Sequence, residues 1–262
     1  MECKHSFAVM AYKDAPYVEE TLKSVLAQNS KSNVYMTTST PSERIEGLAE
    51  KYNVPLYINQ GKAGIVGDWE FSLGCAKTPY VTLADQDDIY HPEYASSVIR
   101  LFDLRPDALI AFTNYSEIDS EGSDRKTNIT MTVKKVLLWP YLFSHSIKGN
   151  ARKMILSFGD PICSPSVTYN LQNLGEVHLF NEEYSMALDW DAWLRMTEKK
   201  GSFCYCRKKL LRHRIHVGTQ TSGGITGGKR YEEDLQIYRR IWPAPVARFL
   251  AKAYSGSYRT NK

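Results

Sequence analysis

The chain has 262 residues, a length that suits one large domain or one domain with a small appendage. Its composition, 43% hydrophobic and 24% charged, excludes a chain that is disordered throughout. The net charge of +4 is small and the basic residues are dispersed, so we do not expect a nucleic-acid-binding protein. No apolar run reaches the roughly 18–20 residues needed to span a bilayer, and the N-terminal apolar run is too short for a secretory signal. We therefore expect a cytoplasmic protein.

The five cysteines do not indicate a disulfide framework, because their number is odd and no secretory signal precedes them. Cys204 and Cys206 would share one face of a strand and could form half of a zinc site. No second pair lies at a useful spacing, so zinc is not expected.

The first 120 residues alternate strand and helix patterns. The expected strands are residues 5–12, 33–39, 56–58, 80–85 and 108–115. The expected helices are one that begins after an Asp14 cap and others at residues 41–52, 67–77 and 91–104. This alternation predicts an α/β fold with a Rossmann-like, mostly parallel sheet and helices on both faces.

The second half is less regular. Residues 116–159 look like a mobile excursion rich in charged and small residues. Beyond them we expect a strand at 165–170, a helix at 189–199, a two-strand ribbon at 202–213 broken at Arg207, and a helix at 229–242. We interpret this half as completing the same sheet and forming the wall for a second substrate.

Residues 243–262 form a basic tail without acidic residues. Its basic residues are Arg248, Lys252, Arg259 and Lys262, and its apolar positions on one helical face are Val246, Phe249, Leu250 and Ala253. A basic amphipathic helix can lie on an anionic membrane surface. The alternative is an ordinary terminal helix with a frayed end.

An acidic cluster follows the predicted strand at 80–85, in the segment LADQDDIYHPEY. Asp85, Asp87 and Asp88 stand within four residues, and their mutual repulsion requires compensation. A hard divalent cation with oxygen ligands, Mg²⁺ or Mn²⁺, is the simplest compensation, with substrate phosphates as further ligands. An acidic turn that caps the next helix is the alternative. The carboxyl ends of parallel strands are where ligands bind in such sheets.

Two later segments carry further chemistry. In LDWDAWLRM, Asp189 opens a helix and is either a cap or a general base, while Asp191 can pair with Arg195. In LRHRIHVGTQTSGG, alternation puts Arg212, Arg214 and His216 on one face and His213 on the other. A glycine-rich loop follows, at 219–228, which we expect to be mobile and to order over a diphosphate.

In this order, the segments resemble the family 2 glycosyltransferases of the GT-A fold, of the type that assembles bacterial polysaccharides. The matching segments are FAVMAYKDAPYVEETLKSVLAQN, VTLADQDDIYHPEY, PSVTYN, DWDAWLR and RIH, and the resemblance covers about residues 5–220. It implies a metal-dependent, inverting transfer of a sugar from a nucleotide-diphosphate donor to a hydroxyl of a glycan or lipid-linked glycan. The implied division is a donor-binding half at 1–120, an acceptor-binding and catalytic half at 121–242, and the tail.

The resemblance also implies roles for individual residues. Asp87 and His216 would ligate Mn²⁺ or Mg²⁺, and Asp85 would contact the metal through a water or bind the ribose. Asp189 matches the general base. The remaining donor contacts would be Ala11 and Tyr12 at the base and Arg214 at the diphosphate.

The sequence departs from the family pattern at three places. The turn after the second strand, Thr38-Ser39-Thr40-Pro41, lacks the carboxylate that many relatives use to bind uracil. Asp68, at a position where many relatives carry Asn or Arg, could contact the base or ribose instead. Leu188 replaces the usual acid before the base. These differences leave the identity of the donor nucleotide undetermined.

Two other functions remain as alternatives. A sugar-phosphate nucleotidyltransferase would carry a Gly-rich, Arg-bearing loop after the first strand, and AYKDAPY has no glycine. A non-catalytic nucleotide-sugar-binding protein would not need the acids that this chain retains. The sugar, the acceptor and the oligomeric state are not determined by the sequence.

Overall fold

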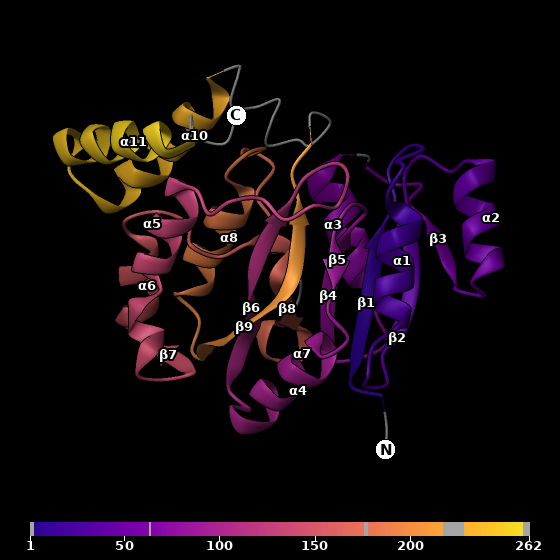
Figure 1. Ribbon diagram of the computed structural model, residues 1–262. Helices are drawn as coiled ribbons and strands as arrows, with labels where there is room; N and C mark the ends of the chain where they lie inside the picture. Colours follow the sequence, from indigo (N-terminus) through magenta and orange to yellow (C-terminus); the bar gives the residue numbers. More distant parts are fainter. Residues whose placement is uncertain (1–2, 63, 176–177, 217–227, 259–262) are drawn as a thin grey trace.

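The computed structural model describes residues 3–62, 64–175, 178–216 and 228–258. These residues form a nine-stranded mixed sheet with helices on both faces (Figure 1). The strand order is β3-β2-β1-β4-β8-β6-β9-β5, and β7 pairs with β9 outside this path. The predicted α/β fold, with a central sheet flanked by helices, is confirmed. The sheet is mixed: β1, β2, β3 and β4 pair in parallel, as do β6 and β9. β8 runs antiparallel to β4 and β6, and β5 and β7 run antiparallel to β9.

The strands are β1 His5–Met10, β2 Asn33–Thr38, β3 Leu56–Ile58, β4 Tyr80–Asp85, β5 Ile89–Tyr90, β6 Ala108–Ile118, β7 Ser146–Lys148, β8 Val167–Asn170 and β9 Ser202–Arg214. The α-helices are α1 Val18–Leu26, α2 Glu43–Lys51, α3 Ile65–Gly74, α4 Tyr94–Leu104, α5 Ile129–Leu137, α6 Asn150–Leu156, α7 Leu171–Leu174, α8 Leu188–Met196, α10 Lys229–Ile241 and α11 Ala244–Tyr258. Two 3₁₀ turns, η1 Trp139–Leu142 and η2 Ser164–Ser166, complete the described elements.

The core has one layer on each face of the sheet, because successive strand residues point to opposite faces. On one face, Phe7 and Val9 of β1 join buried residues of α1, α2 and α4. On the other, Ala8 joins buried residues of α3, α8, α10 and α11, among them Trp190 and Trp193. Burial on both faces explains why the central strands are continuous apolar runs.

The start of the first helix differs from the prediction. The helix α1 begins at Val18, and its N-cap residue Tyr17 makes no side-chain cap. Asp14 instead accepts a hydrogen bond from Ser42 Oγ at 2.6 Å. The expected Asp14 cap is therefore wrong, because the carboxylate is used by a neighbouring loop.

The excursion expected at residues 116–159 is mostly regular structure. It contains the end of β6, then α5, η1, β7 and α6. Thr130 and Met131 of α5 are buried, and Asn128 accepts a hydrogen bond from the Met131 amide to cap the helix. The short strand β7 pairs with β9, a distant contact that local sequence does not encode.

The expected two-strand ribbon at 202–213 is one strand. β9 pairs in parallel with β6 over its whole length. The register shifts where Thr113 pairs with Cys206 and Asn114 pairs with Lys209. Arg207 and Lys208 therefore mark a bulge within the strand and not a turn between two strands.

The basic tail forms α11, which packs on the body through Ala247, Ala251 and Tyr254. The apolar face that the sequence indicated points the other way, since Val246 and Phe249 are exposed. No helix in the described part of the chain is long and apolar enough to cross a membrane.

Candidate active site

The site lies at the carboxyl edge of the parallel strands. The register of β1 and β4 aligns Met10 with Asp85, and that of β6 and β9 aligns Ile118 with Arg214. The segment after β4 enters β5, which pairs with β9 through Ile89 and Arg212. This pairing brings the acidic cluster beside the RIH segment, although they are more than a hundred residues apart in sequence.

Asp88 is the innermost of the three acids. Its side chain is fully buried, lies 2.9 Å from His213 Nδ1, and accepts a hydrogen bond from the Arg214 amide at 2.9 Å. Burial acts to lower the pKa of His213, but the Asp88 carboxylate beside it prevails and raises that pKa to about 9. His213 is therefore a cation at neutral pH, and it compensates Asp88. The sequence placed Asp88 in the acidic cluster, but it did not identify His213 as the partner of Asp88.

Asp87 points to the other end of the cluster. Its Oδ2 lies 3.0 Å from Nε2 of His216, so the two predicted metal ligands come together. Burial raises the pKa of Asp87, and the Asp88 charge adds to the shift. Burial also raises the pKa of Asp85 well above its usual value, and repulsion from the Asp88 and Asp87 carboxylates adds to this shift. A bound cation would offset the cost of burying these mutually repelling carboxylates. The ligand atoms that they offer therefore fit a hard divalent ion.

The described residues include no ready-made group of three His, Cys, Asp or Glu side chains around a metal position. A metal that binds between Asp87 and His216 would therefore need further ligands from water or from a diphosphate, as is usual for Mg²⁺.

Arg214 is buried and holds several segments together. Its Nε donates to the Asp87 carbonyl at 2.9 Å, its Nη1 to the Asp119 carbonyl at 3.1 Å, and its Nη2 to Glu20 at 2.5 Å. Its guanidinium also lies 4.2 Å from the centre of the Tyr17 ring. These contacts connect the end of β9 to the acidic loop, to the segment after β6 and to α1.

The first-strand end is fixed to the acidic loop by a glutamine. The Tyr12 amide donates to Gln86 Oε1 at 2.7 Å, and the Ala11 amide donates to the Thr37 carbonyl at 2.8 Å. The Tyr12 side chain is half exposed, which leaves its ring free to meet a ligand.

Asp68 lies on α3, and both of its carboxylate oxygens accept hydrogen bonds. Ser39 Oγ donates to it at 2.9 Å and Asn59 Nδ2 at 2.7 Å. Ser39 belongs to the turn after β2 that lacks its own acid. The helix therefore supplies a carboxylate to that turn.

Asp189 stands in the first turn of α8 and is partly exposed, and its Oδ1 accepts a hydrogen bond from the Trp190 amide at 2.8 Å. Its charge contributes to the raised pKa of Asp85, so the two carboxylates interact electrostatically. Asp191 is buried and forms ion pairs with Arg195, at 2.8 Å, and with Arg240. The predicted Asp191–Arg195 pair is thus confirmed.

The residues that lead into α8 are held by Glu233 of α10. Its carboxylate accepts hydrogen bonds from the amides of Ser185, Met186 and Ala187 at 2.7–3.1 Å. Burial opposes ionisation, but these N–H donors hold the pKa of Glu233 below its usual value. The sequence contains no local signal for this contact, because Glu233 is 44 residues from Asp189 in the sequence.

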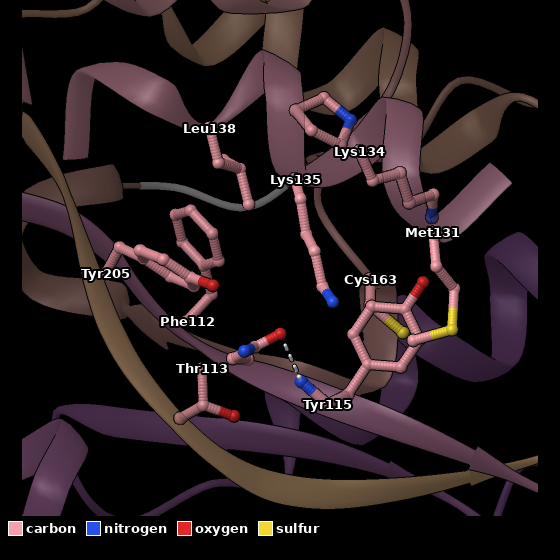
Figure 2. Close-up of a pocket in the computed structure, with 11 residues that line it drawn as sticks. Phe112, Thr113, Tyr115, Met131, Lys134, Lys135, Leu138, Cys163 and Tyr205 are labelled. Atoms are coloured by element: carbon pink, nitrogen blue, oxygen red, sulfur yellow. Dashed lines mark hydrogen bonds between the residues drawn. The ribbon is translucent and has the colours of Figure 1, made fainter. Parts of the chain in front are cut away.

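A small pocket lies between β6 and α5 (Figure 2). It is lined by Phe112, Thr113, Asn114, Tyr115, Met131, Lys134, Lys135, Leu138, Pro161, Cys163 and Tyr205. The Lys134 ammonium lies 5.7 Å from the centre of the Tyr115 ring. Behind it, burial and the charge of Asp189 raise the pKa of Asp160 well above its usual value, while Lys134 opposes the shift. Lys134 of the pocket wall and Asp189 therefore both interact electrostatically with Asp160.

Two remaining predictions concern other positions. All five cysteines are free, and Cys204 and Cys206 lie within β9. The glycine-rich loop expected to be mobile lies outside the described residues up to Gly228, which is the N-cap of α10.

Comparisons with known proteins give the family and the fold. The model of the family described as "Glycosyl transferase family 2" matches residues 6–166. The solved structure of S. aureus TarS 1–349 in complex with UDP-GlcNAc has a TM-score of 0.65 and 16% identity, over 97% of this chain and 72% of that one. The mannosyltransferase PcManGT from Pyrobaculum calidifontis, in complex with GDP-Man and Mn²⁺, has a TM-score of 0.59 and 11% identity, over 99% of this chain and 76% of that one. No curated protein sequence matches the chain. The family match covers more than half of the chain, and the protein therefore belongs to glycosyltransferase family 2.

Proposed function

We propose that this glycosyltransferase transfers a sugar from a nucleotide-diphosphate donor to a hydroxyl group, with inversion and with a divalent cation. The observation that carries the proposal is the meeting of Asp87 and His216 at the edge of the sheet, 3.0 Å apart, with Asp85 beside them. These residues would hold Mn²⁺ or Mg²⁺ against the donor diphosphate. The cation would stabilise the negative charge that develops on the leaving group.

The donor would lie along the ends of β1, β2 and β4, in the half formed by residues 1–120. Ala11 and the half-exposed Tyr12 ring would contact the base. Asp68 would serve the base or ribose, since it already bonds to Ser39 in the turn where the family acid is missing. Nucleotide-sugar donors also occur in the complexes of the structural neighbours.

Arg214 would act as a positioning residue. Its Nε and both Nη atoms are engaged by protein oxygens, so in this conformation its charge supports the acidic loop from behind. The original assignment of Arg214 to the diphosphate would require it to exchange these partners.

Asp189 would be the general base. An acceptor hydroxyl must lose a proton as it attacks. Asp189 is a partly exposed carboxylate in the first turn of α8, where the helix dipole favours negative charge. A single displacement assisted by one base inverts the anomeric centre and needs no enzyme nucleophile.

The acceptor, a glycan or lipid-linked glycan, would bind in the half formed by residues 121–242. The pocket between β6 and α5 supports this, because it combines aromatic rings with Lys134 and Lys135, and Lys134 and Asp189 both interact electrostatically with Asp160. Membrane contact through the tail, at the inner face of the cell membrane, is supported by the outward apolar side of α11.

The test is calorimetry with uridine, thymidine and guanosine diphosphates and their sugars, in Mn²⁺ and in excess chelator, followed by an assay of sugar release. We expect binding that is much weaker in chelator, because the acids repel the diphosphate without a cation. Equal affinity in chelator would refute the metal role. Tight binding without any turnover would favour a non-catalytic binding protein.

A further inference from the structure

One end of the molecule carries a row of exposed apolar side chains at the end of α5 and around η1. Its members are Val136, 63% exposed, Trp139, 53%, Leu142, 63%, and Phe143, 82%. The ring centroids of Trp139 and Phe143 are 6.1 Å apart, so the two rings are neighbours. Single exposed apolar residues are ordinary, but a group of them marks an interaction surface. We call these four residues the α5–η1 edge.

The segment that carries this edge is basic, and two of its basic residues, Arg125 and Lys148, pair with acids of neighbouring segments. From Arg125 to Gly159 the sequence has seven basic residues and no Asp or Glu. Among them, Lys126, Lys135 and Lys153 are exposed, and within the described part of the chain they form no ion pair. The surface is therefore complementary to an anionic partner.

The helix α11 extends the same surface. It contacts α5, and Leu137 and Tyr254 meet at Gly159. Figure 1 shows α5, α6 and α11 together at the end of the molecule away from α1 and α2. Phe249 on the outer side of α11 is 71% exposed, and Arg248 and Lys252 beside it are exposed as well.

We propose that the α5–η1 edge and the outer side of α11 together dock on an anionic lipid bilayer. Aromatic rings favour the membrane–water interface, and lysines and arginines are attracted to anionic headgroups. A protein partner fits less well, because lysine is depleted in protein interfaces. In this proposal the α5–η1 edge contributes to membrane binding as much as α11 does, so the tail is not the sole membrane anchor. The inference stands independently of the proposed sugar transfer.

Docking would also orient the molecule. The helix α5 carries Val136 of the edge and also lines the pocket of Figure 2 with Lys134 and Leu138. A bilayer on the edge would therefore place that pocket close to the headgroups.

The test is co-sedimentation with phosphatidylcholine vesicles made with and without phosphatidylglycerol. We expect the full chain to bind only the anionic vesicles. The double variant Trp139→Ser/Phe143→Ser should lose at least tenfold in binding, and Lys135→Gln and Lys153→Gln about fivefold each, since a basic residue near such a surface contributes about 1 kcal/mol. The matched control is Leu104→Ser at the end of α4, which is 61% exposed and should bind as the parent does.

Three results would overturn the proposal. The first is absence of binding to either vesicle, and the second is undiminished binding of the Trp139→Ser/Phe143→Ser variant while Arg248→Gln/Lys252→Gln abolishes it. The third is concentration-dependent dimerisation that the aromatic variant removes, which would make the edge a protein interface. Nucleotide binding measured on each variant verifies that it is folded, so a failure here is distinguishable from a failure of the proposed function.

Discussion

Asp87 and Asp88 are adjacent in sequence, but the fold gives them different partners. Asp87 faces His216 at the partly exposed end of the cluster. Asp88 is fully buried between His213 and the Arg214 amide. From the sequence we expected Asp88 either to share a cation with Asp85 and Asp87 or to belong to a turn that caps the next helix. The helix α4 has no side-chain cap. The role of Asp88 is to fix the end of β9 against the acidic loop.

Asp87→Asn should abolish Mn²⁺-dependent binding of a nucleoside diphosphate. It should leave the melting temperature almost unchanged, because loss of this charge also removes its repulsion with Asp88. Asp88→Asn should lower the free energy of unfolding by about 3 kcal/mol, because it leaves His213 without its buried counter-charge. Calorimetry and thermal unfolding, performed on both variants, separate these effects. Loss of stability in Asp87→Asn with none in Asp88→Asn would reverse the assignment.

Asp189 and Asp191 allow a second paired comparison. Asp189→Asn should keep donor and metal binding and lower sugar transfer by roughly 10²–10⁴-fold, the usual contribution of a positioned acid–base group. Asp191→Asn removes the partner of Arg195 and Arg240, so it should lower stability while the folded fraction remains active. Product formation at saturating donor is the measurement. If Asp191→Asn loses transfer per folded molecule and Asp189→Asn keeps it, the base is misassigned.

At the scale of elements, the contact between α10 and the start of α8 holds the segment that leads to Asp189, the proposed base. The carboxylate of Glu233 accepts hydrogen bonds from three successive backbone N–H groups just before α8. N–H groups at the start of a helix otherwise lack partners within the helix. The direction of the first turn of α8, and with it the Asp189 side chain, depends on this contact. Displacing a catalytic group by about 1 Å can cost 10²-fold in rate.

We therefore expect Glu233→Gln to reduce the turnover number by about 10- to 100-fold with little change in donor affinity, because its amide NH₂ group would oppose the backbone donors. The neighbouring Glu232 is exposed, and Glu232→Gln is the control, expected to match the parent. Steady-state kinetics of both variants with varied donor is the measurement. Full turnover in Glu233→Gln would show that α8 is held in place without this contact.

At the scale of the whole molecule, His5 connects pH to stability. It lies in β1, near the middle of the sheet, and its ring nitrogens lie 2.9 Å from Ser32 Oγ and 2.9 Å from Thr82 Oγ1. Burial lowers its pKa from 6.5 to about 3. The unfolded chain therefore binds a proton between these values and the folded chain does not, so stability is complete above about pH 6.5 and falls as the pH drops toward 3.

Between pH 7 and pH 5 this residue alone should remove roughly 2 kcal/mol from the free energy of unfolding. In His5→Gln the same interval should show a smaller loss, although the variant starts from a lower stability. The exposed His91 provides the control, and His91→Gln should keep the parent slope. Urea unfolding at both pH values gives the slopes, and identical slopes in the parent and His5→Gln would contradict the assignment.

The sequence by itself determined the α/β class, the strands of the first half and the acidic end of β4, because these depend on local periodicity and on short apolar runs. It also placed Asp189 and Asp191 on α8, because a motif within one helix has fixed geometry.

Only the tertiary structure decided which acid faces outward, that β9 is one strand, and that Asp68, Arg214 and Glu233 tie distant segments together. These outcomes depend on strand order and register between segments far apart in sequence. Such pairings are selected by the packing of the whole sheet, and the residues concerned carry no local pattern that identifies their partners.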